Sequence, residues 1–144
     1  MQGNFLITTD YLKKLDLPIG MLADINWFSQ NFPDGGEYQK VLNKCANEGH
    51  VNLGYWLLRS LGKAHGELSI YFTHVKDPAK IILSAGDVEL MHGADVLYIM
   101  AGGDIKSDGD LTAVDGMEAG GRIEVKGSVK SKKLSLPGRE SMRA

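Results

Sequence analysis

The sequence predicts an α+β protein in which an N-terminal helical unit caps a short C-terminal β-solenoid of hexapeptide-like repeats. Three observations point to this fold class. Apolar residues follow helical spacing over residues 9–62, alternate over 66–75, and then recur every sixth residue from Ile99. The 144 residues fit one domain or two small ones. The expected boundaries are a helical module over 1–65, a strand and solenoid over 66–134, and a basic tail over 135–144.

The first helices of the chain are short. Thr9 is expected to cap a helix through "DYLKKL" because its hydroxyl can accept a free backbone N–H. A second helix is predicted from one apolar face, made by Met21, Leu22, Ile25 and Phe28. The stretch "PDGG" at 33–36 then predicts a turn, since proline fixes φ and glycine accepts positive φ.

The clearest helix runs from Glu37 to Glu48. Its apolar residues fall at i, i+3, i+4 and i+7, which are Tyr38, Val41, Leu42 and Cys45. Gly49 is expected to end this helix. Asn52 is expected to cap a last helix, "LGYWLLRSL", which closes at Gly62. The lone cysteine excludes an internal disulfide, and its place on the apolar face predicts a buried structural thiol.

Residues 66–75, "GELSIYFTHV", alternate as a strand does. Leu68, Ile70 and Phe72 are expected on one face, and Ser69, Tyr71 and Thr73 on the other.

The following segment repeats every six residues. Its first positions carry large apolar residues: Ile99, Ile105, Leu111, Met117, Ile123 and Val129. Its third positions are small or β-branched: Ala101, Ser107, Ala113, Ala119, Val125 and Ser131. Both positions are expected to point inward, and the glycine that occupies four of the six fifth positions permits a bend. An earlier unit, from Ile82 to Val88, fits the same frame, with an irregular stretch at Met91 and His92 between.

Short strands with a bend every six residues predict a coiled β-solenoid. Three hexads per coil would give two coils from the contiguous units, so the ends need caps. Residues 1–75 are the candidate cap for one end. At the other end, the lysines and proline of "KSKKLSLPGRESMRA" are typical of a protected edge, and pairing with a second chain is the alternative.

Two segments resemble known proteins. "AGGDIKSDGD" and "EAGGRIEVKGSVK" resemble the β-solenoid arrays of bactofilin-like, polymer-forming proteins over residues 82–134, although this array is shorter. That resemblance implies a non-enzymatic protein that stacks end to end or docks partners. The first half, with "FPDGGEYQKVL" and then "YWLL", is similar to a helical module of phage and prophage proteins. It implies a phage or mobile-element origin and supplies no catalytic residue.

Charge divides the chain. Residues 1–120 are acidic and residues 121–144 are basic, within a net charge of −2. A ridge of aspartates on a rigid solenoid could imitate a phosphate backbone, and the basic end could dock an acidic partner. Either surface is a candidate contact. The candidate binding residues are Asp104, Asp108, Asp110, Asp115, Lys126, Lys130, Lys132 and Lys133. Solvated turns are the alternative explanation of these charges, and Asp87 and Asp95 belong to the same expected ridge.

Other chemistry finds little support in the sequence. The aspartates of "GDIKSDGD" do not match the spacing of a calcium loop, and no metal or other cofactor is expected. The four histidines, His50, His65, His74 and His92, lie outside the contiguous array, which argues against a hexapeptide acyltransferase. The chain has no apolar run long enough to span a membrane and no secretory signal, so we expect a cytoplasmic protein.

These observations lead to one hypothesis and two alternatives. We expect a non-catalytic protein of a phage or mobile element that binds a host protein complex, with inhibition of a CRISPR-type nuclease as its most specific form. We also expect a homodimer through a solenoid end or the helical unit, and no direct binding of nucleic acid. The alternatives are a bactofilin-like assembly protein and a small acyltransferase-like enzyme.

Overall fold

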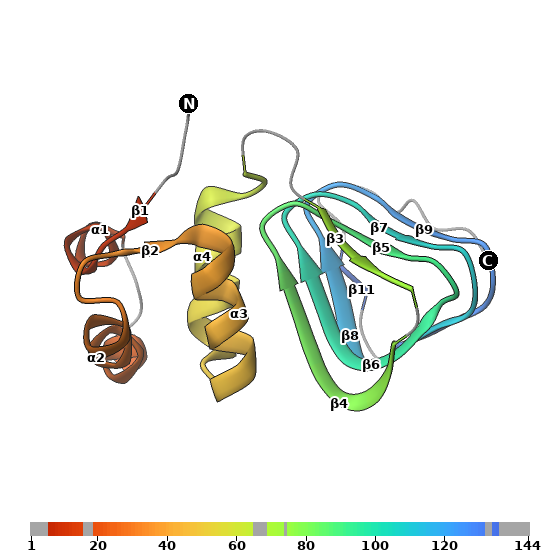
Figure 1. Ribbon diagram of the computed structural model, residues 1–144, viewed down its shortest axis with the longest axis horizontal. Helices are drawn as coiled ribbons and strands as arrows, with labels where there is room; N and C mark the ends of the chain where they lie inside the picture. The colour runs from red at the N-terminus through yellow and green to blue at the C-terminus, as the bar shows by residue number, and fades with distance from the viewer. Residues whose placement is uncertain (1–5, 16–18, 65–68, 74, 132–133, 136–144) are drawn as a thin grey trace.

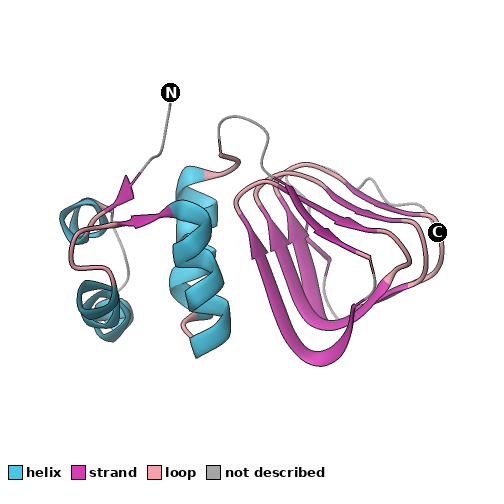
Figure 2. Cartoon of the chain, viewed as in Figure 1, coloured by secondary structure: helices cyan, strands magenta, loops and turns pink. Residues whose placement is uncertain are grey.

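The computed structural model describes residues 6–15, 19–64, 69–73, 75–131 and 134–135. The chain is α+β, as predicted: helices occupy the N-terminal half and a parallel β-solenoid the C-terminal half (Figure 2). The N-terminal elements are β1 (Leu6–Ile7), α1 (Thr9–Lys14), the 3-10 turn η1 (Ile19–Met21), α2 (Leu22–Asn31), β2 (Gly36–Glu37), α3 (Tyr38–Glu48) and α4 (Val51–Leu61). The solenoid strands are β3 (Ser69–Phe72), β4 (Val75–Ser84), β5 (Asp87–Leu90), β6 (Ala94–Ala101), β7 (Ile105–Ser107), β8 (Leu111–Ala119), β9 (Ile123–Val125), β10 (Val129–Ser131) and β11 (Leu134–Ser135).

The helix ends follow local chemistry, with two corrections at the N-caps. Thr8, rather than Thr9, caps α1, and its hydroxyl accepts the N–H of Tyr11 at 3.0 Å. His50 precedes α4, so Asn52 lies inside the helix and caps nothing. Gly49 ends α3 with φ of 82°, as predicted.

Each coil of the solenoid takes about three hexads, the coil length considered from the sequence. Ile105 pairs with Ile123, and Ile99 pairs with Met117, eighteen residues apart, whereas Ile82 pairs with Ile99 seventeen residues apart. Two parallel sheets result, in the orders β3-β5-β7-β9 and β4-β6-β8-β10, with β11 also paired with β8. The strands of the second sheet bend midway, so the coil has three sides. The coils make about three turns (Figure 1).

The predicted inward positions form the solenoid core. The described first-position and third-position residues from Ile99 to Val125 are all buried. One difference concerns where the solenoid begins. β3 pairs in register with β5, so residues 69–72 are the first strand of the solenoid and not part of a cap. The stretch at Met91 and His92 is a corner of the same coil, between β5 and β6.

The helical unit lies along one side of the solenoid. α3 and α4 pack against the outward-facing residues of β4 and β6: Ile81, Leu83, Tyr98 and Met100. Arg59 of α4 also pairs with Glu118 of β8 at 3.0 Å. This position differs from an end cap because β4 and β6 are apolar on both faces. The inner face fills the solenoid core, and the outer face is buried only by helices beside it (Figure 1).

Candidate functional site

The N-terminal end of the solenoid carries a cleft of about 340 Å³. One wall is the polar side of α3, and the other is the open end of the first coil. The cleft is lined by Gln39, Asn43, Ala46, Asn47, Ile70, Phe72, Lys80, Ile81, Ile82 and Leu83. We call this region the end cleft. It matters because the end of a solenoid exposes strand edges, which are ready-made sites for pairing with another chain.

The edge of β4 at the end cleft is already occupied. The Ser84 carbonyl accepts the N–H of Gly102, which follows β6. Because backbone groups alternate in direction along a strand, the N–H and carbonyl groups of Leu83 and Ala85 point away from β6. The Gln39 amide takes both of them: its Nε2 donates to the Leu83 carbonyl at 2.8 Å, and its Oε1 accepts the Ala85 N–H at 2.7 Å. The N–H of Ala64 donates to the Ala85 carbonyl at 2.7 Å. This part of the β4 edge is therefore closed.

The edge of β3 is arranged differently. The Phe72 carbonyl accepts the N–H of Met91, so Phe72 faces β5. Backbone groups alternate in direction along a strand of a parallel ladder, and those of Tyr71 therefore point away from β5, toward the open edge. The side chains of Ile70 and Phe72 face the end cleft and are only half-buried.

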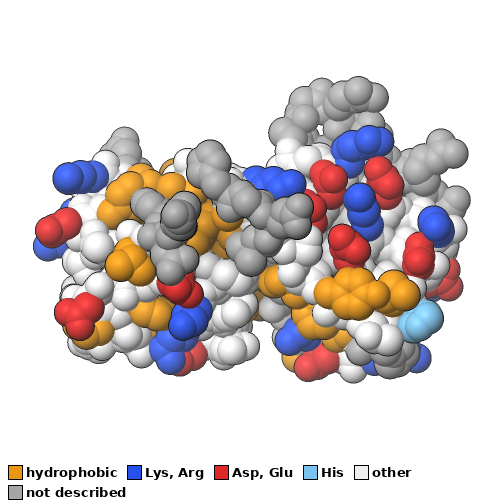
Figure 3. All heavy atoms as spheres, turned by 45° about the horizontal axis from the view of Figure 1, so that its top comes forward, with side chains coloured by type: hydrophobic (Ala, Val, Ile, Leu, Met, Phe, Trp, Pro, Cys, Tyr) orange, Lys and Arg blue, Asp and Glu red, His pale blue; other side chains and the backbone are white. Residues whose placement is uncertain are grey.

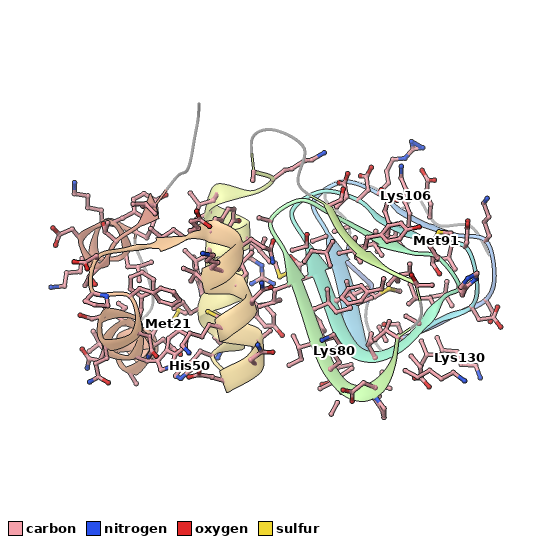
Figure 4. The ribbon with its side chains drawn as sticks, in the orientation of Figure 1. Met21, His50, Lys80, Met91, Lys106 and Lys130 are labelled. Carbon is pink, nitrogen blue, oxygen red and sulfur yellow. The ribbon has the colours of Figure 1, made fainter. Side chains whose placement is uncertain are left out.

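A cation and exposed apolar side chains flank this edge. The Lys80 ammonium lies 5.8 Å from the centre of the Phe72 ring, and Figure 4 labels Lys80 beside β4. On the outer face, Tyr71 is 56% exposed and Met91 is 38% exposed. Figure 3 shows hydrophobic side chains gathered on the solenoid half next to charged ones. The first coil thus combines a strand edge that is unpaired among the described strands, apolar contacts and a positive charge.

Sequence reasoning did not find Gln39 or Lys80 as functional residues. Gln39 is a polar residue on an otherwise ordinary helix face, and Lys80 ends the polar stretch "KDPAK", which lies within β4. No local sequence pattern marks either residue, because Leu83 lies 44 residues from Gln39 and Phe72 lies 8 residues from Lys80 along the chain. Phe72 and Ile70 were expected to point inward, and the described residues confirm this.

The predicted acidic residues do not form one ridge. Asp104 lies at the corner before β7, Asp108 and Asp110 lie at the corner after it, and Asp115 lies at the bend within β8. Residues six apart fall on successive corners of a three-sided coil, and only residues about eighteen apart stack. The carboxylates are therefore distributed around the solenoid.

Three aspartates act as links between coils. Asp87 accepts the backbone N–H of Asp104 at 2.8 Å, Asp104 accepts that of Arg122 at 2.9 Å, and Asp110 accepts that of Ser128 at 2.9 Å. A Cβ on the glycine that precedes each donor would overlap the carboxylate. Each carboxylate holds the next coil, and Gly103, Gly121 and Gly127, which precede the three donors, make room for it.

We expect Asp104→Ala to lower the free energy of unfolding by about 1–2 kcal/mol, because it removes a hydrogen bond between coils. Asp104→Asn should lose less, since its amide oxygen still accepts. Asp108→Ala is the matched control: Asp108 pairs only with the exposed Lys126 among the described residues, at 3.2 Å, so the loss should stay within about 0.5 kcal/mol. Urea unfolding measures all three. Equal losses for Asp104→Ala and Asp108→Ala would contradict the linking role.

The predicted basic residues are placed in part. Lys126 follows β9, and Lys130 is exposed on β10 (Figure 4). Lys132 and Lys133 lie outside the described residues. In the register of the sheet, Lys130 continues a column that runs through Thr112 and Asp95 to Lys76.

The helical unit holds a second polar cluster. The His50 ring stacks on Trp27 at 4.1 Å, and its Nδ1 lies 2.6 Å from a carboxylate oxygen of Asp24. Hydrogen bonds from Lys44 and Trp27 lower the pKa of Glu48. Cys45 is buried as predicted. Burial, followed by the charges of Asp24 and Glu48, raises the pKa of its thiol to about 12. The thiol is therefore protonated at neutral pH and is not an activated nucleophile.

Two further features concern metals and membranes. Within the described ranges, no three histidine, cysteine or acidic side chains come together as a group that could hold a metal ion. No helix in the described part of the chain is long and apolar enough to cross a membrane.

Comparison with known proteins bears on the helical half. Residues 1–62 match the family model of the YdhT N-terminal domain. The match covers α1 to α4 and ends where α4 closes, before the solenoid begins. Fewer than half of the residues are covered, so the likeness concerns the helical unit. No curated protein matches the chain, and no solved structure matches it.

Proposed function

We propose that this protein is a non-catalytic protein-interaction protein and that the end cleft is its docking site. The observation that carries the proposal is the contrast between two neighbouring strand edges. Gln39 and Ala64 hold the backbone of β4 at Leu83 and Ala85, whereas the Tyr71 backbone on β3 points to an edge at which no described strand pairs. An open edge next to half-exposed apolar side chains supports binding to another protein.

The described side chains give less support to catalysis. The buried thiol of Cys45 is protonated at neutral pH, and His50 pairs with Asp24 on the helical unit, away from the end cleft. His92 is exposed at a corner of the solenoid. An acyltransferase-like activity therefore remains the weakest of the three hypotheses.

The two binding hypotheses require different features of the solenoid. Inhibition of a CRISPR-type nuclease, for a phage or mobile element in a host cytoplasm, relies on an acidic ridge. The distribution of Asp104, Asp110 and Asp115 over three corners weakens its geometric support. Bactofilin-like assembly relies on head-to-tail stacking. Such stacking would place Lys130 of one copy over Lys76 of the next, and like charges directly opposite each other are destabilising.

The first test is the solution mass of the full chain, by light scattering over a hundredfold range of concentration. We expect a fixed monomer or dimer, because Gln39 occupies part of the edge that a stacked coil would need. Growth into open assemblies would overturn this proposal in favour of the assembly protein. The second step is capture of partners from host lysate, compared at low and high salt.

A further inference from the structure

We propose that β3 binds one extended strand of a partner protein, with apolar side chains at alternate positions and a carboxylate that meets Lys80. This inference rests on the proposed protein-binding function and names its contact. It concerns the end cleft alone, and it commits to a single strand rather than a complete coil.

The occupant is a single strand because, among the described residues, the edge of β3 is unpaired whereas the end of the β4 edge is held. A coil added to this end would have to pair with both β3 and β4. The Gln39 amide and the Ala64 N–H already hold the backbone of Leu83 and Ala85 on β4. On β3, the N–H and carbonyl of Tyr71 point to the open side. A strand laid there gains main-chain hydrogen bonds without displacing Gln39.

The apolar pattern of the occupant follows from the core columns. Ile70 stacks on Val88, Ile105 and Ile123, and Phe72 stacks on Leu90. The later members of these columns are buried, with Val88 and Ile105 at 0% exposure, whereas Ile70 and Phe72 are only half-buried. A strand with apolar residues at i and i+2 would bury both side chains, as the neighbouring coils do for Val88 and Ile105.

The carboxylate expected on the partner strand is inferred from the positive charge of Lys80. Lys80 lies at the end cleft over the Phe72 ring, and in the described part of the chain it takes part in no ion pair. The opposite wall carries the neutral amides of Gln39, Asn43 and Asn47. An acidic side chain on the entering strand would therefore meet one cation and no competing carboxylate among the lining residues.

A second copy is a poorer occupant than a foreign strand. Its β10 end would bring Lys130 against Lys76, and Lys80 adds a further cation at the same end. Charge complementarity thus favours an acidic partner strand.

The test uses the full chain and an array of synthetic peptides. One set alternates valine or leucine with polar residues and carries a glutamate at varied positions. A matched set has the same compositions in shuffled order. We expect the alternating set to bind, with preference for glutamate near one end. We also expect Tyr71→Pro to weaken that binding at least about tenfold, because proline removes the N–H on the open edge.

The control variants distinguish loss of the Tyr71 N–H from loss of the Tyr71 side chain and from misfolding. Tyr71→Ala keeps the N–H and should retain more affinity than Tyr71→Pro. The ladder with β5 uses the backbone of Phe72 rather than that of Tyr71, so Tyr71→Pro should still fold, as judged by circular dichroism. Lys80→Glu is a second variant, at a half-buried position of β4. It should lose affinity for the glutamate peptides by about tenfold.

Three results would overturn the inference. Equal binding of alternating and shuffled peptides would remove strand addition, and so would equal binding by the Tyr71→Pro and Tyr71→Ala variants. A dimer of the wild type that dissociates in Tyr71→Pro would assign the edge to a second copy. If Tyr71→Pro still captures the same lysate protein as the wild type, this inference fails while the proposed protein-binding function stands. If the wild type captures nothing, the proposed function itself fails.

Discussion

Replacement of Gly93 by alanine is expected to destabilise the protein by about 2–5 kcal/mol. Two costs add at this corner between β5 and β6. Gly93 has φ of 86°, and an L-residue in the left-handed region costs roughly 1–2 kcal/mol. A Cβ at this position would also overlap the carbonyl oxygen of Asp110, which accepts the N–H of Ala94 at 3.1 Å. Overpacking of this kind costs about 1–3 kcal/mol more.

Gly49→Ala is the matched control for this prediction. Gly49 has φ of 82°, yet a Cβ there would meet no atom within 4 Å. The Gly49 variant therefore carries only the backbone cost, about 1–2 kcal/mol. Urea unfolding of both variants separates the two terms. If Gly93→Ala loses no more free energy of unfolding than Gly49→Ala, the corner at Gly93 can shift to accommodate a Cβ. The spacing between coils would then not exclude a side chain there.

Gln39→Ala should lower the free energy of unfolding by about 2–4 kcal/mol. It leaves the Leu83 carbonyl and the Ala85 N–H without their partner, and each unsatisfied group in a partly buried site costs about 1–3 kcal/mol. The variant also opens the edge of β4, and we expect its mass by light scattering to rise with concentration. Gln39→Glu keeps the acceptor for Ala85 but sets a carboxylate oxygen against the Leu83 carbonyl, so it should not restore the stability of the wild type.

Asn43→Ala controls for changes in helix α3 itself. The Asn43 amide oxygen accepts from Gln39 at 3.0 Å, so the control removes this i, i+4 contact and leaves the bonds to β4 in place. A loss of about 0.2–0.5 kcal/mol is expected. If the two alanine variants are equally stable, the Gln39 amide does not hold the β4 edge. An unchanged mass for Gln39→Ala would show that this edge does not control self-association.

The two strand edges of the first coil connect these predictions with function. Gln39 holds the end of the β4 edge at Leu83 and Ala85, and the Tyr71 backbone points to the edge of β3 that no described strand pairs with. A chain with both edges open would be prone to stacking, and a chain with both closed would offer no strand site. The asymmetry limits the end cleft to a single strand.

The acidic residues illustrate what pattern reasoning could not provide. A ridge of aspartates on the solenoid was one hypothesis from the sequence, with solvated turns as the alternative. In the structure, Asp104 and Asp110 lie at different corners of the coil, and each carboxylate accepts a backbone N–H from the next coil. The signal that could have found this role is the eighteen-residue spacing from each aspartate to its donor. That spacing becomes meaningful only once the length of one coil is known.

The sequence by itself determined the class of fold and the core of the solenoid. Each of these depends on local periodicity: helical spacing over α3, alternation in β3, and the six-residue recurrence of residues such as Ile105 and Ile123. Only the tertiary structure decided that α3 lies beside β4 and β6, that Gln39 closes one edge, and that Lys80 flanks the other. The reason is that Ile81 and Ile82 look alike in the sequence, although one faces the helices and the other the solenoid core. Which face a helix covers depends on shape and hydrogen bonding between distant segments, and periodicity along the chain carries no information about either.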